Sequence, residues 1–531
     1  MKRILLGLLP FWDPHIPPLG IACLKSFLRK KGFSVRGVDS NLEVKFREPR
    51  DLYFTLLRKH IPNERAGNLL NLGNQVLRNH MMAHLNKTDQ RFFFELLDIL
   101  IYNAFFVHLD VPILRELDSI IDEFYSRLET YVLALLKEEN PAVWGLSVYG
   151  DTLPASVFAF RLAKKHFPDV KTVMGGGIFA DQLAPGSFNL EYFVHREGKY
   201  IDKIFVGEGE LLMAKYLLGE LSYGKKVVGL HDIGNITMEV DNAEIPDFSD
   251  FDLRSYPYLA HYGARSCPFR CTFCSETISW GSYRKKTVSR SVQEIVQLFR
   301  RYSRRVFLMT DSTLNPIVSE LAQEFIDAGD AIYWDGFLRV DSHAGDVDNT
   351  TLWRKGGFYR ARLGLESGSQ RVLDLMNKNI TLDQSEAALA SLAFAGIKTD
   401  TFWLFGHPGE MEEDFLRTLD FVEANKDNIY EANCNTFNYY LTGQVNSDEW
   451  MKNGKIKMLY PEWTTEMLVS QTWVLDRPPA LEESYNRLNR FVQHCEKLGI
   501  PNPHISNDVN QADKRWRDLH PNAVPPLSEL K

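Results

Sequence analysis

The sequence predicts an α/β protein with two parallel sheets: a doubly wound sheet, then a partial (β/α)6 barrel followed by a helical C-terminal tail. Short apolar strands alternate with amphipathic helices over most of the chain. A long helical segment, about 42–140, interrupts the first series, and a polar linker, 221–256, separates it from the second. The chain has 531 residues, more than one hydrophobic core usually supports, so two large domains are expected.

The first domain is assigned to residues 1–220. Its predicted strands are Lys2–Pro10, Ser34–Asp39, Ala142–Tyr149, Thr172–Gly175 and Lys203–Val206. Helical periodicity between them, at Leu19–Lys31 and Ala155–Phe167, is typical of a doubly wound (Rossmann-like) sheet with a ligand crevice at the carboxyl ends of its strands. The insertion at 42–140 has almost no turn chemistry, so we expect several helices there that form a lid or an extra packing layer.

The second domain is assigned to residues 257–441, where strand–helix units resume. Its predicted strands are Tyr258–Ser266, Arg305–Met309, Ile332–Phe337, Arg360–Leu365, Thr399–Phe405 and Glu431–Tyr439. Six such units indicate a partial barrel, whose chemistry sits at the carboxyl ends of the strands. Residues 442–531 are expected to be helical, with an amphipathic helix at Glu482–Cys495, and then Pro-rich, packing across the barrel before fraying.

Composition favours an ordinary globular enzyme, with 44% apolar and 24% charged residues. A formal charge of −8 disfavours a nucleic-acid binder. The apolar start of the chain is interpreted as a buried strand, because no small-residue cleavage site follows it. The apolar stretch Phe92–Val107 contains Glu95 and Asp98, which indicates a core helix rather than a membrane span. We therefore expect a cytoplasmic protein without membrane contact.

The strongest chemical signal is a group of three cysteines, Cys267, Cys271 and Cys274, spaced Cys-x3-Cys-x2-Cys after a predicted strand. Thiolates are the soft ligands that an iron–sulfur cluster needs, and without a fourth ligand nearby one iron would stay open. Structural zinc is the alternative, but it needs four ligands, and the only nearby candidate, His261, lies within or before the strand. The other cysteines are interpreted as buried structural thiols: Cys23, Cys434 and Cys495. Cys434, on the predicted sixth strand, could instead face the barrel interior.

This cysteine motif resembles the signature of the radical S-adenosylmethionine (SAM) superfamily. The resemblance continues in order through Gly364–Arg371 and Gly406–Glu410. It implies a [4Fe–4S] cluster whose open iron binds SAM, and it implies SAM contacts from Phe273 (adenine), Glu366 (ribose or amino group), Asp311 (methionyl amine) and Gly406. The alternatives are core packing for the aromatic residue, and helix capping or a loop salt bridge for the two carboxylates.

The first domain resembles the cobalamin-binding domains that are fused to radical SAM barrels in class B-like radical SAM methyltransferases and their relatives. The matching segments are Pro17–Ala22, Trp144–Tyr149, Met174–Gly177 and Val206–Glu210. They imply that cobalamin is contacted by Pro18, Gly20, Ser147, Tyr149, Gly175, Gly176, Gly177, Gly207, Glu208 and Gly209. Glycines at strand ends would let the backbone approach a flat macrocycle.

One departure concerns the cobalt ligand. Asp13-Pro14-His15 matches the beginning of the family's Asp-x-His-x-x-Gly motif, but Pro18 stands in place of the glycine. His15 is therefore interpreted as a loop residue, and members without the motif bind cobalamin without histidine ligation. A plain nucleotide-binding domain is disfavoured, because no Gly-x-Gly-x-x-Gly follows the first strand.

The resemblance implies a cobalamin-dependent radical SAM enzyme that acts on an unactivated carbon of a small-molecule or peptide-derived substrate, by C-methylation in the largest set of relatives. It implies an electron donor such as flavodoxin or ferredoxin. Two alternatives stay open: cyclisation, rearrangement or hydroxylation, with or without functional cobalamin, and a non-catalytic iron–sulfur or zinc protein. Neither the insertion nor the tail carries a pattern that identifies the substrate.

Overall fold

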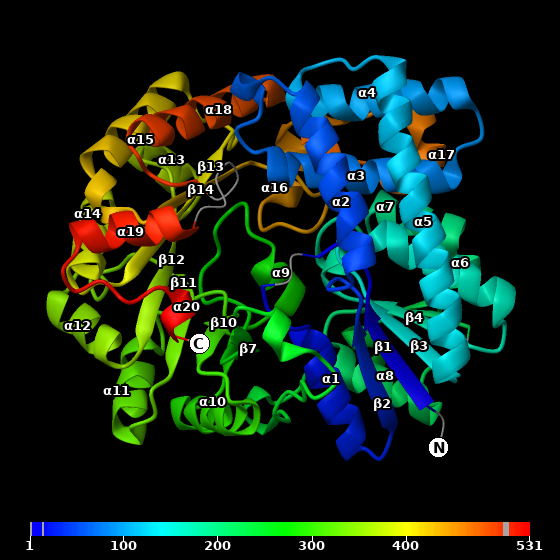
Figure 1. Cartoon of the computed structure of the whole chain (residues 1–531), viewed down its shortest axis with the longest axis horizontal. Helices are drawn as coiled ribbons and strands as arrows, with labels where there is room; N and C mark the ends of the chain where they lie inside the picture. The colour runs from blue at the N-terminus through cyan, green and yellow to red at the C-terminus, as the bar shows by residue number, and fades with distance from the viewer. Residues whose placement is uncertain (1–2, 13–14, 223, 503–508, 531) are drawn as a thin grey trace.

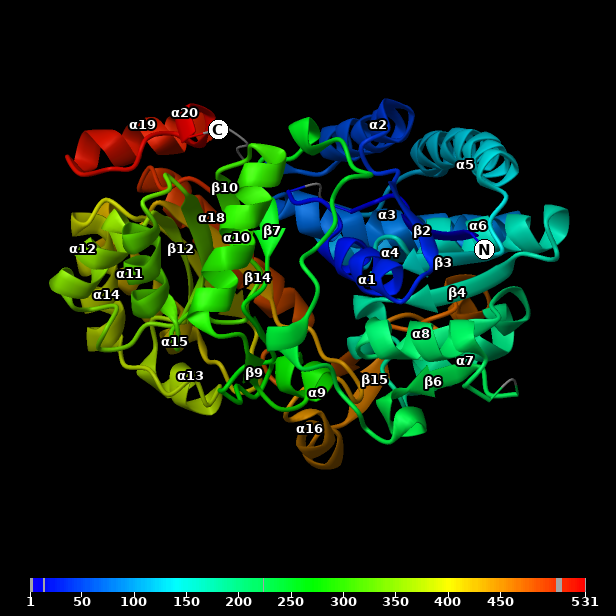
Figure 2. The same cartoon turned by 90° about the horizontal axis from the view of Figure 1, so that it is seen from below.

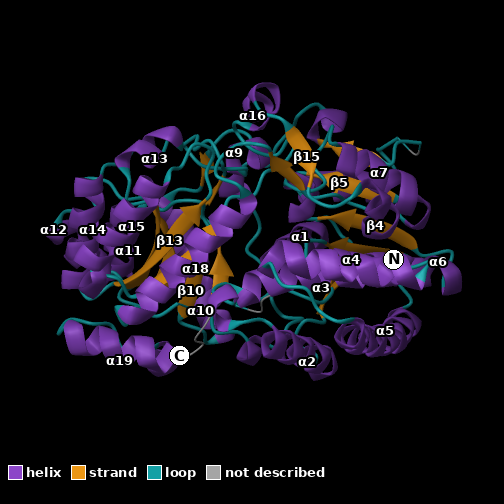
Figure 3. Ribbon diagram, turned by 90° about the horizontal axis from the view of Figure 1, so that it is seen from above, coloured by secondary structure: helices purple, strands orange, loops and turns teal. Residues whose placement is uncertain are grey.

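Two parallel sheets lie side by side in the computed structural model, which describes residues 3–12, 15–222, 224–502 and 509–530 (Figure 1). The doubly wound half contains the N-terminal strands and the barrel half contains the later ones, as the view from below also shows (Figure 2). Most helices lie outside the sheets (Figure 3). The predicted fold class, an α/β chain with a doubly wound sheet, a helical insertion, a six-stranded barrel sheet and a helical tail, is confirmed.

The first sheet has the strand order β2-β1-β3-β4-β5-β6, and all its pairs are parallel. Its strands are β1 Arg3–Leu8, β2 Ser34–Asp39, β3 Val143–Ser147, β4 Lys171–Gly175, β5 Lys203–Val206 and β6 Val227–Gly229. The order reverses between β1 and β3, and ligands of such sheets bind outside the carboxyl ends of the strands at that switch point.

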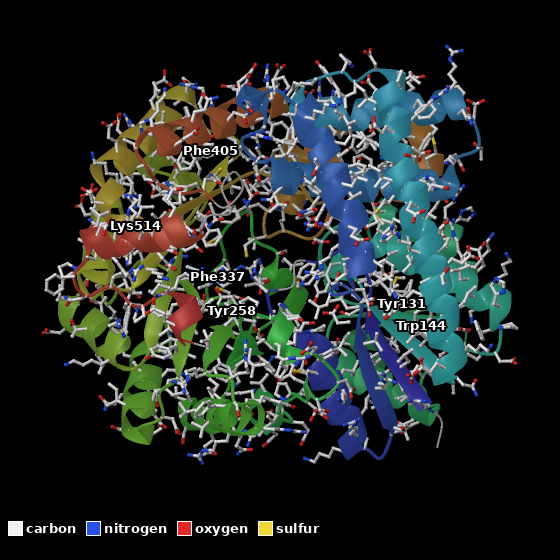
Figure 4. The ribbon with its side chains drawn as sticks, viewed as in Figure 1. Tyr131, Trp144, Tyr258, Phe337, Phe405 and Lys514 are labelled. Atoms are coloured by element: carbon white, nitrogen blue, oxygen red, sulfur yellow. The ribbon has the colours of Figure 1, made fainter. Side chains whose placement is uncertain are left out.

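Strand β1 is buried on both faces, which explains its nearly continuous apolar sequence. Ile4, Leu6 and Leu8 point into a core shared with helices α1 Leu19–Lys30 and α8 Gly209–Leu218 and with the barrel. The alternate residue, Leu5, points into a second core, formed with α6 Leu153–His166 and the insertion. Trp144 on β3 is fully buried in this second core; Figure 4 labels it beside Tyr131 of the insertion.

The insertion is a layer of four helices, α2 Val44–His60, α3 Leu69–Asn86, α4 Gln90–Phe105 and α5 Val111–Glu139, as predicted. It covers α6, and α3 also reaches the barrel, where Asn68 Nδ2 donates to the backbone oxygen of Cys434 at 2.9 Å. Helix α4 corresponds to the apolar stretch at 92–107 and is largely buried on one side. Within the described residues, every helix is too short or too polar to cross a membrane.

The barrel sheet is parallel, with the order β14-β13-β12-β11-β10-β7. Its strands are β7 Leu259–His261, β10 Val306–Met309, β11 Tyr333–Leu338, β12 Phe358–Glu366, β13 Lys398–Phe405 and β14 Glu431–Thr436. Its outer helices are α10 Val288–Tyr302, α11 Val318–Ala328, α12 Val347–Lys355, α13 Gln370–Leu375, α14 Leu382–Phe394 and α15 Glu412–Ala424.

Three sequence predictions need correction. The single strand expected at Tyr258–Ser266 is broken, because after β7 the chain leaves the sheet and β8 Ala264–Arg265 pairs with β9 Arg284–Lys285 in an antiparallel ribbon. The expected linker is not wholly irregular, because it supplies β6. The tail is not wholly helical, because β15 Ile456–Met458 and β16 Trp473–Leu475 form a hairpin.

The tail helices are α16 Ser447–Asn453, α17 Thr465–Leu468, α18 Leu481–Lys497, α19 Val509–Leu519 and α20 Leu527–Leu530. Helix α17 packs against α3 of the insertion rather than on the barrel. Helix α18, the predicted amphipathic helix, lies against β13 and β14. Its Phe491 ring is 5.6 Å from that of Trp403. Helix α19 does not fray as expected, because the Tyr430 hydroxyl donates to its buried Asp513 at 2.9 Å.

Candidate functional site

The three cysteines lie on one loop between the β8–β9 ribbon and helix α9 Glu276–Trp280, and none of them forms a disulfide. Cys271 is buried, while Cys267 and Cys274 are partly exposed. Burial raises the pKa of the Cys267 thiol, and it raises that of Cys274 to about 11. Coordination to a metal centre would keep these groups as thiolates, since a coordinating thiol is deprotonated.

Two distant segments fix the conformation of this cysteine loop. On one side, Thr272 N–H donates to the backbone oxygen of Met376, in the α13–α14 connection, at 2.9 Å. On the other, Val445 N–H donates to the Cys274 oxygen at 3.1 Å, and Gln444 Nε2 donates to the Phe273 oxygen at 2.9 Å. The thiol positions are therefore set by backbone contacts from both sides of the loop rather than by the loop alone.

The donor set matches the needs of a cluster better than those of a zinc ion. Within the described residues, no group of three or more His, Cys, Asp or Glu side chains is arranged to hold a single metal ion. His261, the only candidate for a fourth zinc ligand, is fully buried and hydrogen-bonds Glu294 at 2.9 Å. The loop instead offers three soft donors without a fourth, which suits a [4Fe–4S] cluster with one open iron.

Arg339, which follows β11, was missed by sequence analysis. Its Nη1 lies 3.6 Å from the Sγ of Cys271, and its guanidinium carbon is 4.1 Å from the centre of the Phe269 ring. Its Nη2 is buried without a hydrogen-bond partner in the protein. A buried guanidinium donor beside the thiols is suited to an anionic group such as the carboxylate of SAM.

Phe273 and Glu366 are brought together by Lys378, another residue that sequence analysis missed. Lys378 Nζ lies 2.7 Å from Glu366 Oε1 and 5.8 Å from the centre of the Phe273 ring. Glu366 ends β12 at a register shift, with a φ of 65°, a conformation that a non-glycine residue adopts at a cost of about 1–3 kcal/mol. The run Asn377-Lys378-Asn379, with both asparagines at positive φ, is the local signal that marks this turn.

Asp311, expected to bind the methionyl amine, is fully buried just after β10. Both of its carboxylate oxygens lie within hydrogen-bond distance of Gly263 N–H, at 2.9 and 3.1 Å. Burial raises its pKa to about 6, against the lowering effect of these backbone donors. The structure therefore gives this carboxylate a backbone partner behind the cysteine loop, and its contact with SAM stays a prediction.

Gly406, expected near SAM, has a φ of 86°, and a side chain there would overlap Ser484 of α18. Its N–H donates to Glu410 Oε2 at 2.7 Å. The neighbouring His407, whose pKa burial lowers to about 4, pairs through Nε2 with Thr272 Oγ1 of the cysteine loop at 3.1 Å. Packing alone accounts for the glycine, while the histidine links this segment to the cysteines.

The inside of the barrel is layered below its rim. Asp335 pairs with Arg360 at 2.7 Å and with Arg362 at 2.9 Å, forming a charged floor. Above it the rings of Phe337 and Phe402 are 5.9 Å apart. Phe337 (labelled in Figure 4) is 38% exposed although β11 lies within the sheet, so the barrel interior is open at this level.

The glycines after β4 are explained by the protein itself. Gly176 has a φ of 122°, and a Cβ there would lie 2.5 Å from the backbone nitrogen and oxygen of Val148. A Cβ at Gly177 would lie 3.0 Å from the Tyr149 ring. The close approach of the ends of β3 and β4 explains why these two residues are glycine. From the sequence alone, the glycines were explained by the approach of the cofactor. Gly175 meets only ordinary contacts, the nearest at 3.5 Å.

The starts of helices α1 and α8 are more open. A Cβ at Gly20 or Gly209 would meet nothing within 4 Å, and Gly207 has a φ of 94°. Pro18, at the N-cap of α1, supplies no side-chain cap, so first-turn amides are available to a polar ligand. At the β1/β3 switch point, Tyr149 stacks on Trp12 at 4.1 Å, and its hydroxyl is hydrogen-bonded by Ser147.

Glu208 links the two domains through ion pairs and is not an unpaired carboxylate at the crevice. It lies 2.9 Å from Arg265 and also pairs with Arg284, while Arg265 pairs with Glu210 as well. These four residues are called the interdomain clamp: Glu208 on the β5–α8 connection, Glu210 in the first turn of α8, and Arg265 and Arg284 on the β8–β9 ribbon. Because Arg265 lies two residues before Cys267, the clamp fixes the start of the cysteine loop to the edge of the first sheet. His15 is exposed, and Asp13 and Pro14 lie outside the described residues.

These features define a class: a two-sheet α/β protein with a cluster-binding thiol loop at the mouth of a partial barrel. Residues 262–422 match the model of the Radical SAM superfamily, and this part of the chain is a radical SAM domain. The chain as a whole is 26% identical over 307 residues to the anaerobic magnesium-protoporphyrin IX monomethyl ester cyclase of Rubrivivax gelatinosus. It is 27% identical over 320 residues to an uncharacterized methyltransferase of Pyrococcus horikoshii.

These alignments cover 52% and 55% of this chain, and 53% and 66% of the respective relatives. Among solved structures, the radical SAM methyltransferase TsrM from Kitasatospora setae matches with a TM-score of 0.59 at 15% identity, covering 94% of this chain and 90% of that one. The cobalamin-dependent radical SAM enzyme OxsB matches with a TM-score of 0.53 at 16% identity, covering 81% of this chain and 53% of that one. At these identities the likeness establishes the two-domain fold.

Proposed function

We propose that this chain is a cobalamin-dependent radical SAM enzyme that methylates an unactivated carbon of a small-molecule or peptide-derived substrate. The observation that carries the proposal is a juxtaposition. The cysteine loop begins where the barrel meets the carboxyl edge of the doubly wound sheet, and Arg265 ties it to Glu208 of that edge at 2.9 Å. A radical generated at the loop and a methyl donor held at the edge would thus face a common space.

On the barrel side, Cys267, Cys271 and Cys274 would hold three irons of a [4Fe–4S] cluster. Arg339 would bind the carboxylate of SAM, and Lys378, oriented by Glu366, would place a positive charge beside the adenine-binding Phe273. When bound, the cluster and SAM supply one-electron cleavage of a carbon–sulfur bond, and cobalamin supplies a transferable methyl group. The protein's part is to position these groups and to exclude water.

On the edge of the first sheet, the uncapped start of α1 at Pro18 and Gly20 and the open backbone at Gly207 and Gly209 support cobalamin binding. The stacked pair Trp12–Tyr149 at the switch point supplies an aromatic surface. Structures named for TsrM and OxsB contain cobalamin, and this chain shares their fold. An outside electron donor such as flavodoxin or ferredoxin would reduce the cluster, in the reducing cytoplasm where such a thiolate centre persists.

A second reaction type uses the same parts. Three of the relatives are magnesium-protoporphyrin cyclases, which favours ring formation as the runner-up over rearrangement or hydroxylation. Methylation and cyclisation are distinguished by their products, because methylation adds one carbon from SAM to the substrate and cyclisation adds none. A non-catalytic iron–sulfur or zinc protein would bind metal without cleaving SAM.

The test uses the full chain, reconstituted anaerobically with iron, sulfide and hydroxocobalamin. We expect about four irons and four sulfides per chain, corrinoid absorbance that survives gel filtration, and 5′-deoxyadenosine released from SAM after reduction. With SAM labelled at its methyl carbon, the label should appear on cobalamin and then on the substrate. Zinc in place of iron, or an intact cluster that never cleaves SAM, would refute the proposal.

Paired cysteine variants separate the cluster from the fold. Cys271→Ala should abolish 5′-deoxyadenosine release, because one iron ligand is lost. Cys495→Ala removes an equivalent thiol from the buried face of α18 and should retain release. Equal activity of the two variants would exclude the cysteine loop as the cluster site.

A further inference from the structure

A second site is a partly open cavity of about 110 Å³ between the insertion, the first sheet and the tail. It is lined by α3, by the loop after η2 Gly177–Ala180, by the segment after β14 and by the β15–β16 hairpin. Its volume suits a small head group. None of the residues expected to contact cobalamin lines it, so the cavity is distinct from the expected cobalamin crevice.

The cavity wall is joined to the cysteine loop by the segment after β14, in which Gln444 makes the side-chain link. Tyr440 lines the cavity, and its N–H donates to Gln444 Oε1 at 3.0 Å. The other end of that amide, Gln444 Nε2, donates to the Phe273 oxygen in the cysteine loop at 2.9 Å. The cavity wall and the loop that would hold the cluster are thus parts of one hydrogen-bonded unit.

One buried acceptor on the cavity wall has no partner. Gln471 is 5% exposed; its Nε2 bonds Thr464 and Thr465 at 3.3 and 3.2 Å, and its Oε1 is unpaired. Its backbone is held by Asn189, which pairs with both its N–H at 2.9 Å and its oxygen at 2.8 Å. A buried amide oxygen that is rigidly held and unpaired is costly unless a ligand donates to it.

A carboxylate lies on the same wall. Asp181 is partly buried, and desolvation raises its pKa to about 6 although Gln182 N–H donates to it. Arg78 also lines the cavity and acts to lower the pKa of Asp181, but it is shared with other groups. It lies 3.3 Å from Asp151 and, with the Gln182 amide in its alternative orientation, bonds the Gln182 oxygen at 3.0 Å. Because Asp151 takes this guanidinium and no described residue forms an ion pair with Asp181, the Asp181 carboxylate is only partly compensated.

Five aromatic residues also line the cavity, beside polar residues from α3 and the tail: Phe437, Tyr439, Tyr440, Trp473 and Tyr485. Aromatic faces attract ammonium groups, and the combination of a carboxylate, an amide oxygen and aromatic rings is typical of a site for an organic cation. Trp473 Nε1, which is buried without a hydrogen-bond partner among the described residues, would accommodate an oxygen on the same molecule.

We propose that this cavity binds the ammonium group of an amine-bearing substrate, with Asp181 as its counter-ion and Gln471 Oε1 as a second acceptor. The inference rests on the proposed function only in naming the bound molecule a substrate. Because Gln444 joins the cavity wall to the cysteine loop, such a substrate would be anchored by its amine beside the centre that generates the radical.

The test compares three probes of one shape, benzylammonium, benzyl alcohol and benzoate, by saturation-transfer NMR on the reconstituted full chain. Benzylammonium should bind at least tenfold more tightly than the other two. Asp181→Asn should reduce that preference to within about twofold, and Asp181→Glu should retain it. Asp122→Asn, an equal change of charge at an exposed site on α5, should leave the preference unchanged. Equal binding of amine and alcohol, or a preference that survives Asp181→Asn, would overturn the assignment.

The melting curve of Asp181→Asn shows whether that variant is folded. If it is not folded, Gln471→Leu is used in its place, and amine binding should fall by about fivefold or more. Retained amine binding in that variant would also overturn the assignment. SAM cleavage and cobalamin retention are measured on the same samples. If wild-type protein cleaves SAM and keeps cobalamin but shows no amine preference, only the cavity assignment fails. If it binds amines and never forms a cluster, the proposed function fails while the cavity assignment stands.

Discussion

The interdomain clamp gives the most direct test of how the two domains are held together. Arg265 is 9% exposed and pairs with Glu208 and Glu210, which come from the other sheet. In Arg265→Met, Glu208 keeps Arg284, but among the described residues Glu210 has no other ion pair. The Arg265 guanidinium carbon also lies 5.2 Å from the centre of the Tyr262 ring and 5.6 Å from that of Trp280. Methionine retains much of the apolar stem, so the variant removes the charge together with its ion pairs and ring contacts.

Breaking a buried ion pair from one side costs about 3–5 kcal/mol, because the remaining charge stays buried without compensation. We expect this loss in the free energy of unfolding of Arg265→Met. Without its cationic partner, Glu210 would have a folded-state pKa above its unfolded value, so the native state would bind the extra proton. The loss should accordingly be larger at pH 8 than at pH 5.

Urea unfolding at both pH values, followed by tryptophan fluorescence, measures the loss. The double variant Arg265→Met/Glu210→Gln removes the stranded charge, and its stability should return to within about 1.5 kcal/mol of wild type, since replacing both members of a buried pair is often nearly neutral. A loss below 1 kcal/mol in the single variant, or a double variant no more stable than the single one, would refute the electrostatic account of the clamp.

Two further predictions concern glycines and a buried acid. Gly176→Ala should destabilise the fold by about 3–5 kcal/mol, because a Cβ would lie 2.5 Å from Val148 backbone atoms at a φ of 122°. Gly20→Ala should leave thermal stability unchanged and weaken only cobalamin retention, because a Cβ there meets nothing within 4 Å. Equal melting temperatures for the two variants would contradict this. Asp311 has a folded-state pKa of about 6 against an ordinary 3.8, so the native state binds the extra proton and stability should fall by about 2 kcal/mol as pH rises from 4 to 6. The difference in urea midpoint between wild type and Asp311→Asn, measured across that range, should show this slope, and a difference independent of pH would exclude it.

Much of the strand layout could be predicted because buried parallel strands are short apolar runs bounded by turn residues. The boundaries of β2 and β5 match the predicted ranges, and the predicted range of every later barrel strand overlaps β10 to β14. The first barrel strand could not be predicted in this way. Residues 258–266 are buried throughout, so their pattern does not show that the chain leaves the sheet at Tyr262.

The candidate site was predicted only where its residues are adjacent in sequence. The cysteines form a local motif, but Arg339 and Lys378 are recognised only by their distances to Cys271 and Glu366, which depend on the packing of separate strands. Gly176 shows another limit of sequence, since a glycine at a strand end suggests cofactor approach, whereas the structure shows that a neighbouring backbone also requires it; its contact with cobalamin stays a prediction. Sequence shows which residues lack side chains but not what occupies the space.

The tail and the insertion supply parts of the site itself. Val445 and Gln444, beyond the last barrel strand, bond the cysteine loop directly, and Gln444 also bonds the cavity wall at Tyr440. The opposite wall comes from α3 of the insertion and from the loop of Asp181. An occupant of the cavity would therefore alter the same hydrogen bonds that hold the cysteines, so substrate binding and the geometry of the radical-generating centre would be coupled through the segment that contains Gln444 and Val445.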